Sequence, residues 1–262
     1  MHVQTLICFG AHPGDGNPAL VIEHDGMDAA ARQAYAAERN TTCVFLSTDN
    51  EVDYFYPHMR SPLCLHATLA VAAVLFERAA DGADADAGKT IAVHTAMKGQ
   101  LLRLSREGGD YFVRLAPQSA PAIAIRDEHI AALLNAPGLA IASAPQVASV
   151  GSPKLLVEVR DPDTLYGLQP DLAGIHAWSK QQGVNGVYVY CRLDAATFEG
   201  RNFNHLDPAL EDSATGVAAG ALALALGGDL LLRQGRATGR DCLIRARFED
   251  GAVLVGGAAA QA

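Results

Sequence analysis

Short apolar runs and longer segments of small residues alternate along the chain. Apolar runs of about four to eight residues between turn-forming residues are typical of buried strands. In the first half such runs cover 3–9, 19–22, 43–47, 54–56, 90–95, 100–104 and 111–115. In the second half they cover 155–159, 187–193, 242–248 and 252–255. We predict a strand at each.

The segments between these strands predict helices over 27–39, 64–79, 127–135, 170–182 and 213–226. Two of them, 64–79 and 213–226, consist mainly of Ala, Gly, Val and Leu. A helix that is apolar nearly all round is buried rather than amphipathic. Because each half of the chain has one such helix among its strands, we predict two half-domains that each wrap a sheet around a central helix.

A domain boundary is predicted in the segment 117–121, which has two prolines and a serine in five residues. The predicted domains are 1–117 and 118–262, and the last strand is free to return to the first domain. The segment 79–88, rich in Ala, Asp and Gly, is predicted to be an exposed loop. The predicted fold class is α/β (α+β), with two pseudo-symmetric domains and a cleft between their central helices.

Composition and charge restrict the function further. The 262 residues carry twenty Lys and Arg against twenty-nine Asp and Glu, and half of the residues are hydrophobic. The acidic balance argues against a nucleic-acid partner, because no basic stripe is available to meet phosphates. The longest apolar stretches, 69–76 and 217–226, are far shorter than the ~20 residues of a membrane span. We therefore expect neither nucleic acid nor membrane as a partner.

Metal, disulfide and export signals are missing from the pattern. The five cysteines are widely spaced without a CxxC motif, and the nine histidines show no spacing typical of a metal site. The first residues show no signal-peptide pattern, so a cytoplasmic protein is expected. We expect no metal site.

Four segments carry a resemblance to a known family. They read Gly-Asn-Pro-Ala at 16–19, Tyr-Phe-Tyr-Pro at 54–57 with Cys-Leu-His-Ala-Thr-Leu-Ala at 64–70, Arg-Asn-Phe at 201–203 with Glu-Asp-Ser-Ala-Thr-Gly at 211–216, and Gln-Gly at 234–235 with Gly-Arg at 239–240. On these segments the chain resembles the phenazine-biosynthesis isomerase (PhzF-like) family, which shares the diaminopimelate epimerase fold. The resemblance spans most of the chain. It implies cofactor-free proton transfer at a carbon next to a carboxylate or in a conjugated acid, and a homodimer.

The resemblance places His66 and Asp212 at two positions where family members carry acid/base residues. A histidine can shuttle protons near neutral pH, since its unperturbed pKa is ~6.5. The competing interpretation of Asp212 is an ordinary helix N-cap. The free N–H groups at the starts of the two central helices predict a carboxylate site. The predicted substrate-binding residues are Asn17, Arg60, Leu65, Ala67, Thr68, Thr215, Gly216 and Val217.

The family's catalytic glutamate is absent from this chain. An ungapped alignment from Asn40 puts Cys43 at its position, whereas one deletion puts Thr42 there. A thiolate can abstract an α-proton, so Cys43 is the third candidate catalytic residue, although a buried structural cysteine is equally natural in an apolar run. Cys64 lies where the related epimerases carry their first catalytic cysteine.

Three further departures affect the predicted substrate pocket. Leu65 replaces the family's glycine before the histidine, Arg60 replaces an acidic residue, and Val217 replaces a serine. Arg60 is either an ordinary solvated charge or a ligand for a second acidic group of the substrate.

These observations predict a cofactor-independent isomerase or epimerase that moves a proton on a small carboxylic or amino acid in the interdomain cleft. One alternative is a lyase or dehydratase on the same fold, because proton abstraction beside a leaving hydroxyl gives elimination. A second alternative is a family member that binds a small molecule and has lost activity, which the missing Glu, Gly and Ser support.

Overall fold

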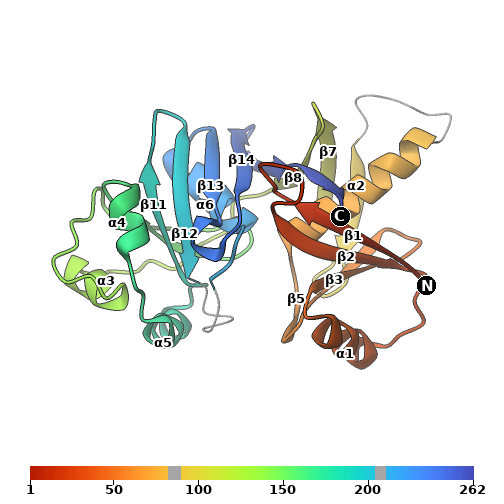
Figure 1. Ribbon diagram of the computed structural model, residues 1–262, viewed down its shortest axis with the longest axis horizontal. Coiled ribbons are helices and arrows are strands. Elements are labelled where there is room, and N and C mark those ends of the chain that lie inside the picture. The colour runs from red at the N-terminus through yellow and green to blue at the C-terminus, as the bar shows by residue number, and fades with distance from the viewer. Residues whose placement is uncertain (82–89, 204–210) are drawn as a thin grey trace. The chain divides into compact units, whose positions relative to one another are not determined.

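The structure of the protein is a computed structural model that describes residues 1–81, 90–203 and 211–262. The chain divides into two compact units, Met1–Leu115 with Gly256–Ala262 and Ala116–Val255 (Figure 1). Each unit combines a mixed sheet with helices, which confirms the predicted fold class. Most of the predicted loop at 79–88 lies outside the described residues.

The sheet of the first unit is mixed. Its strands follow the order β16-β1-β2-β3-β4-β6-β7-β8, and β5 pairs with β4. The pairs β2–β3 and β4–β6 are parallel, and the other neighbours are antiparallel. The strands are β1 (His2–Cys8), β2 (Asn17–Glu23), β3 (Thr42–Leu46), β4 (Glu51–Tyr56), β5 (Met59–Ser61), β6 (Ile91–Thr95), β7 (Leu101–Glu107), β8 (Asp110–Leu115) and β16 (Ala259–Gln261).

Helix α2 (Leu65–Asp81) is the central helix of the first unit. It contacts strands β1, β2, β3, β6, β7, β8 and β16. Its side chains from Leu65 to Phe76 are buried, as an apolar helix requires. Helix α1 (Ala29–Arg39) packs on the opposite face of the sheet over a second apolar core. Asp28 begins α1, since its carboxylate accepts the N–H of Ala31, and Asn40 ends it in the left-handed conformation.

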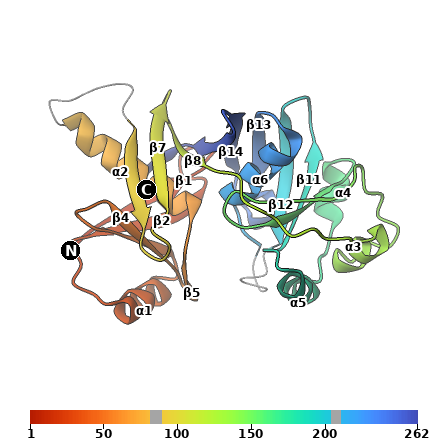
Figure 2. The ribbon, with the colours of Figure 1, turned by 180° about the vertical axis from the view of Figure 1, so that it is seen from behind.

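The second unit repeats this plan. Its strands follow the order β14-β13-β12-β11-β10-β9. Helix α6 (Gly216–Leu226) contacts β9, β10 and β14, and it lies behind β11 and β12 in Figure 1 and in front of them in Figure 2. The strands are β9 (Gln146–Ala148), β10 (Lys154–Glu158), β11 (Val187–Arg192), β12 (Thr197–Phe203), β13 (Leu230–Gln234) and β14 (Cys242–Glu249), and β15 (Ala252–Gly257) spans the division between the units.

The other face of the second sheet is covered by α3 (Asp127–Leu133), α4 (Pro162–Gly167) and α5 (Leu172–Gln182). Ile130, Leu165 and Trp178 from these helices pack against Leu155 and Val187 of the sheet. Side chains alternate along a strand. The neighbouring positions on β10 and β11 therefore face α6.

The order of strand pairing is the same in both units. In the first unit β2–β3 is parallel, β3–β4 antiparallel, β4–β6 parallel and β6–β7 antiparallel. In the second unit β10–β11, β11–β12, β12–β13 and β13–β14 follow in the same alternation. Helices α2 and α6 stand at the same point in this order, as do α1 and α5. The predicted pseudo-symmetric halves are thus present in the topology.

Several elements were not predicted from the sequence. Strand β12 was missed because polar residues and Gly200 interrupt its apolar pattern, and β13, α4 and the three-residue strands β5, β9 and β16 were missed as well. Helix α6 begins at Gly216 rather than at Ser213, because the residues before Gly216 form the turn that leads into it. Among the helices of the described residues, none is long and apolar enough to cross a membrane.

Candidate functional site

The first group of predicted site residues meets at the N-terminus of α2. Cys64 precedes the helix and His66 lies in its first turn, with 3.4 Å between Sγ of Cys64 and Nδ1 of His66. Both residues are buried, at 2% and 8% exposure. The hydroxyl of Tyr56, at the end of β4, also hydrogen-bonds the sulfur. We call Tyr56, Cys64 and His66 the α2 cluster.

The surroundings of Cys64 favour its thiolate form. Burial alone would raise the pKa of the thiol, but the charge of His66 and hydrogen bonds from His66, Tyr56 and the Ala67 N–H outweigh it. The pKa of Cys64 therefore lies below its ordinary value. The positive end of the helix dipole acts in the same direction. Cys64 and His66 together form a pair that can hold and release a proton.

Cys43 and Thr42 are the two alternatives for the position of the missing family glutamate. They are neighbours on β3, so their side chains lie on opposite faces of the sheet. Cys43 packs with Phe45 and Phe55 in the core beneath α1. Burial raises the pKa of Cys43 to about 11, although Arg39 acts in the opposite direction. Because side chains alternate along a strand, Thr42 lies on the face that α2 covers. Thr42, but not Cys43, therefore lies on the same side of the sheet as α2.

Arg60 lies with an ion-pair network on the α1 side of the sheet. Its guanidinium donates to both carboxylate oxygens of Asp53, at 2.8 and 3.0 Å, and lies over the ring of Phe55. Asp53 also accepts from Arg32, which in turn is paired with Asp25. The charge of Arg60 is therefore neutralised within the protein, on the face away from the α2 cluster.

The remaining predicted residues of the first unit surround the start of α2. Leu65 and Ala67 are buried in the first turn. The hydroxyl of Thr68 donates to the Cys64 carbonyl at 2.7 Å and lies 2.7 Å from the hydroxyl of Tyr54. Thr68 thus holds the start of the helix against β4. Asn17 begins β2 and is half-buried.

The second group of predicted residues meets at the N-terminus of α6. Oδ2 of Asp212 accepts the hydroxyl of Thr215 at 2.6 Å. Nε2 of Gln234 donates to the Asp212 carbonyl at 2.7 Å and to Oγ1 of Thr215 at 3.0 Å. Oε1 of Gln234 accepts the hydroxyl of Tyr188 at 3.1 Å and the Thr215 N–H at 3.3 Å. We call Tyr188, Asp212, Thr215 and Gln234 the α6 cluster.

Asp212 is not the N-cap of α6. That position belongs to Thr215, three residues later, whose side chain makes no capping hydrogen bond. Gly216 and Val217 are the first residues of the helix, so their N–H groups have no acceptor within it. The α6 cluster therefore combines a half-buried carboxylate with N–H groups suited to an anion.

Arg201 anchors the segment that carries Asp212. Its guanidinium pairs with both oxygens of Glu211, at 3.0 and 2.8 Å, and donates to the carbonyls of Leu165 and Leu168 at 2.9 and 3.0 Å. The side chain is 9% exposed. These contacts fix the backbone beside Asp212 to α4 and β12.

Gly200 lets Tyr188 reach the α6 cluster. A Cβ added at Gly200 would lie 2.6 Å from Cζ and 2.7 Å from Cε1 of the Tyr188 ring. The Gly200→Ala variant is expected to lose about 1–3 kcal/mol of unfolding free energy, because the buried ring has to move. Urea denaturation measures the loss. Gly228→Ala is the control, since a Cβ there meets nothing within 4 Å. Equal stability of the two variants would contradict the packing described.

Several residues of the two clusters were not predicted as site residues from the sequence. Tyr56 and Gln234 lie inside the quoted motifs, so the motifs themselves were the available signal. No sequence feature marks Tyr188 as a site residue, because it resembles any other aromatic residue of a buried strand. Within the described residues, no three His, Cys, Asp or Glu side chains gather as metal ligands would.

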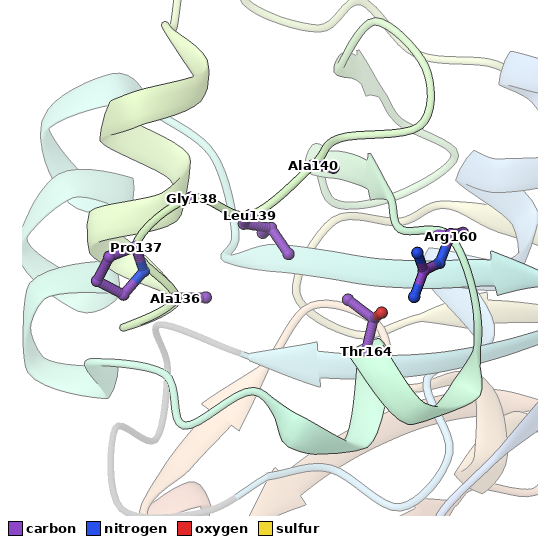
Figure 3. Close-up of a pocket in the computed structure, with 7 residues that line it drawn as sticks. All are labelled: Ala136, Pro137, Gly138, Leu139, Ala140, Arg160 and Thr164. Carbon is purple, nitrogen blue, oxygen red and sulfur yellow. The ribbon is translucent and has the colours of Figure 1, made fainter.

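A separate hollow of about 330 Å³ lies in the second unit (Figure 3). Leu139, Arg160 and Thr164 line it together with residues 136–138 and 140. Its lining includes none of the predicted site residues. Arg160 is paired with Asp161 and is 80% exposed, so the hollow offers no buried polar group for chemistry.

The sequence and the fold both have known relatives. The family model described as phenazine biosynthesis-like protein matches residues 7–262. An uncharacterized isomerase of Escherichia coli is 29% identical over 92% of this chain and 88% of its own length. A predicted epimerase from Pseudomonas aeruginosa aligns with a TM-score of 0.79 at 26% identity, covering 99% of this chain and 96% of its own. A PhzF-family protein from Bacillus anthracis gives a TM-score of 0.80 at 20% identity, covering 100% and 97%.

Proposed function

Because the chain belongs to the phenazine biosynthesis-like protein family, we propose that it is a cofactor-independent isomerase or epimerase that moves a proton on a small carboxylic or amino acid. Relatives named as isomerases and as a predicted epimerase support this class of reaction. The supporting observation in the structure is that each central helix starts beside a group that can exchange a proton. The proposal requires that the α2 cluster and the α6 cluster serve one substrate.

The substrate carboxylate is held by the N–H groups of Gly216 and Val217 at the start of α6. The dipole of the same helix stabilises the enolate-like charge that develops when a proton leaves the neighbouring carbon. Asp212 accepts that proton, and the hydroxyl of Thr215 holds its carboxylate in place.

His66 and Cys64 supply the second proton-transfer group. Their 3.4 Å contact allows the imidazole and the sulfur to share one proton, which returns to the substrate at the new position. Cys43 has no step in this mechanism, since it lies beneath α1 with a raised pKa. The missing family glutamate is thus replaced by the Cys64–His66 pair.

Proton NMR in D₂O tests the proposal. The protein is incubated with pools of amino, hydroxy and conjugated acids, and the loss of a carbon-bound proton signal identifies the substrate. The exchange has to depend on Asp212. Asp163→Asn is the matched control, because Asp163 is an exposed carboxylate on α4 of the same unit.

Three outcomes separate the alternatives. Exchange without a change in molecular formula supports the isomerase or epimerase. An alkene product formed with loss of water would instead indicate a lyase. Ligand binding without any exchange would contradict the proposal and favour a binding protein.

A further inference from the structure

Lys154, the first residue of β10, is a buried cation without a hydrogen-bond partner. The residue is 0% exposed, and Nζ contacts no acceptor within the described residues. Leu155 and Val157 face the core beneath α3–α5. The alternation of side chains directs Lys154 to the opposite face, which α6 covers. A buried amine with three unused donors normally has a partner, so a ligand is the natural candidate.

The fold itself does not require a lysine at this position. The segment Gly-Ser-Pro-Lys at 151–154 repeats Gly-Asn-Pro-Ala at 16–19, and each leads into the first strand of the same pairing order. Lys154 thus corresponds to Ala19, which is fully buried beneath the central helix of its own unit. A methyl group satisfies the packing at Ala19. Packing alone therefore does not explain the long, amine-bearing side chain of Lys154 in the second unit.

The charged surroundings of Lys154 connect it to the α6 cluster. Asp212 acts on it electrostatically and favours its charged form. The other ionisable side chains on the same faces of the packed strands are Glu158 on β10, Tyr188 and Tyr190 on β11 and Cys242 on β14, whereas Glu211 before α6 is already paired with Arg201. Helix α6 and strand β9 carry no ionisable side chains. Burial outweighs the effect of Asp212 and lowers the pKa of Lys154 to about 7.

A second buried polar side chain next to Asp212 also lacks partners. Nδ2 and Oδ1 of Asn202 both make no hydrogen bond within the described residues, and the residue is 0% exposed. Its backbone forms an antiparallel bridge with Asp212. The carboxamide offers both an NH₂ group that donates and a carbonyl oxygen that accepts, whereas Lys154 offers donors alone.

We propose that Lys154 and Asn202 bind the substrate at the α6 cluster, and that the substrate is an α-amino or α-hydroxy acid. The ammonium of Lys154 binds the carboxylate together with the N–H groups at the start of α6, and Asn202 binds the neighbouring amino or hydroxyl group. This inference rests on the proposed function and names its substrate class. Since an anion favours the charged lysine, the ligand binds together with a proton, and binding weakens as pH rises.

NMR spectroscopy of the lysine side chains tests this inference without turnover. The chain has four lysines, at 89, 98, 154 and 180, so ¹³Cε labelling gives a spectrum that single substitutions assign. Lys154→Arg identifies the Lys154 signal by its loss. Lys180→Met is the matched control, because Lys180 is exposed on α5 of the same unit.

The Lys154 signal is expected to titrate near pH 7, about 3 pH units below the ordinary lysine value of ~10.4. DL-Serine and DL-lactate are expected to raise its midpoint by at least about 0.5 unit, and propionate by less, because propionate has no donor for Asn202. Because binding and protonation are linked, a midpoint raised by about 0.5 unit means that the apparent Kd of both probes rises about threefold as pH rises through the midpoint, and by more where the shift is larger.

A Lys154 signal that titrates with the other lysines and ignores saturating serine and lactate would overturn the inference. The inference would also be overturned if propionate raised the Lys154 midpoint as much as serine and lactate do, because Asn202 would then make no contribution to binding. Deuterium exchange with an unchanged KM in Lys154→Met would overturn it too, while leaving the proposed function intact.

Discussion

Replacing Asp212 with asparagine is expected to lower the rate of substrate-dependent deuterium exchange by about 10²–10⁴-fold. An amide has nearly the same shape as the carboxylate but cannot accept the proton. The Asn oxygen can still accept the hydroxyl of Thr215, so the turn before α6 is expected to persist. The loss is therefore chemical rather than structural. Initial rates from ¹H NMR in D₂O, compared with the wild type and Asp163→Asn, measure it.

Three further variants make this prediction specific. His66→Asn is expected to reduce exchange by a similar factor, whereas His94→Gln, at an exposed position on β6, should leave the rate unchanged. Thr215→Val removes only the hydroxyl that holds Asp212, so a smaller loss of about tenfold is expected. Thermal denaturation confirms that each variant is folded. Exchange that survives in Asp212→Asn would exclude Asp212 as the proton acceptor.

The fold was readable from the sequence because its strongest signals are local. The helices α2 and α6 are apolar on nearly every side, and such a composition is typical of a helix buried in a core. Strand β12 was not readable in the same way. Gly200 and the polar residues around it break the alternation, although they belong there because Tyr188 needs the space and Arg201 holds Glu211.

The candidate site was readable only where a motif named the residue. His66 and Asp212 became candidates through the resemblance, and the structure shows their contacts with Cys64 and Thr215. The position of Cys43 beneath α1 could not be deduced, since a shift of one residue moves a side chain to the other face of a strand. Tertiary contacts decide such cases.

Charged residues were the hardest to interpret from the sequence. The sequence left two interpretations of Arg60, a solvated charge and a substrate ligand. Its pairing with Asp53 depends on β5, which was not predicted. The sequence did not single out Lys154 as a functional residue, because a single lysine before an apolar run is typical of the end of a strand. Its significance comes from burial without a partner, which only the folded chain reveals.

Arg201→Met is expected to lower the free energy of unfolding by about 3–5 kcal/mol. The substitution leaves the carboxylate of Glu211, which is 16% exposed, without its cation. It also leaves the carbonyls of Leu165 and Leu168 without their donor. Urea denaturation followed by circular dichroism measures the loss. Arg192→Met is the control, because Arg192 is 45% exposed and lies 3.9 Å from Glu158, so a change within about 1 kcal/mol is expected there.

The double variant Arg201→Met with Glu211→Leu tests the cause of this loss. If the cost comes from an uncompensated buried carboxylate, removing that carboxylate restores about 1–3 kcal/mol relative to Arg201→Met alone. If instead the carbonyls of α4 dominate, the double variant is no more stable than the single one. Since Glu211 precedes Asp212, the restored fold is also expected to lack exchange, because Asp212 loses its anchored backbone while the protein remains folded. Full exchange in the double variant would contradict the positioning role of Arg201.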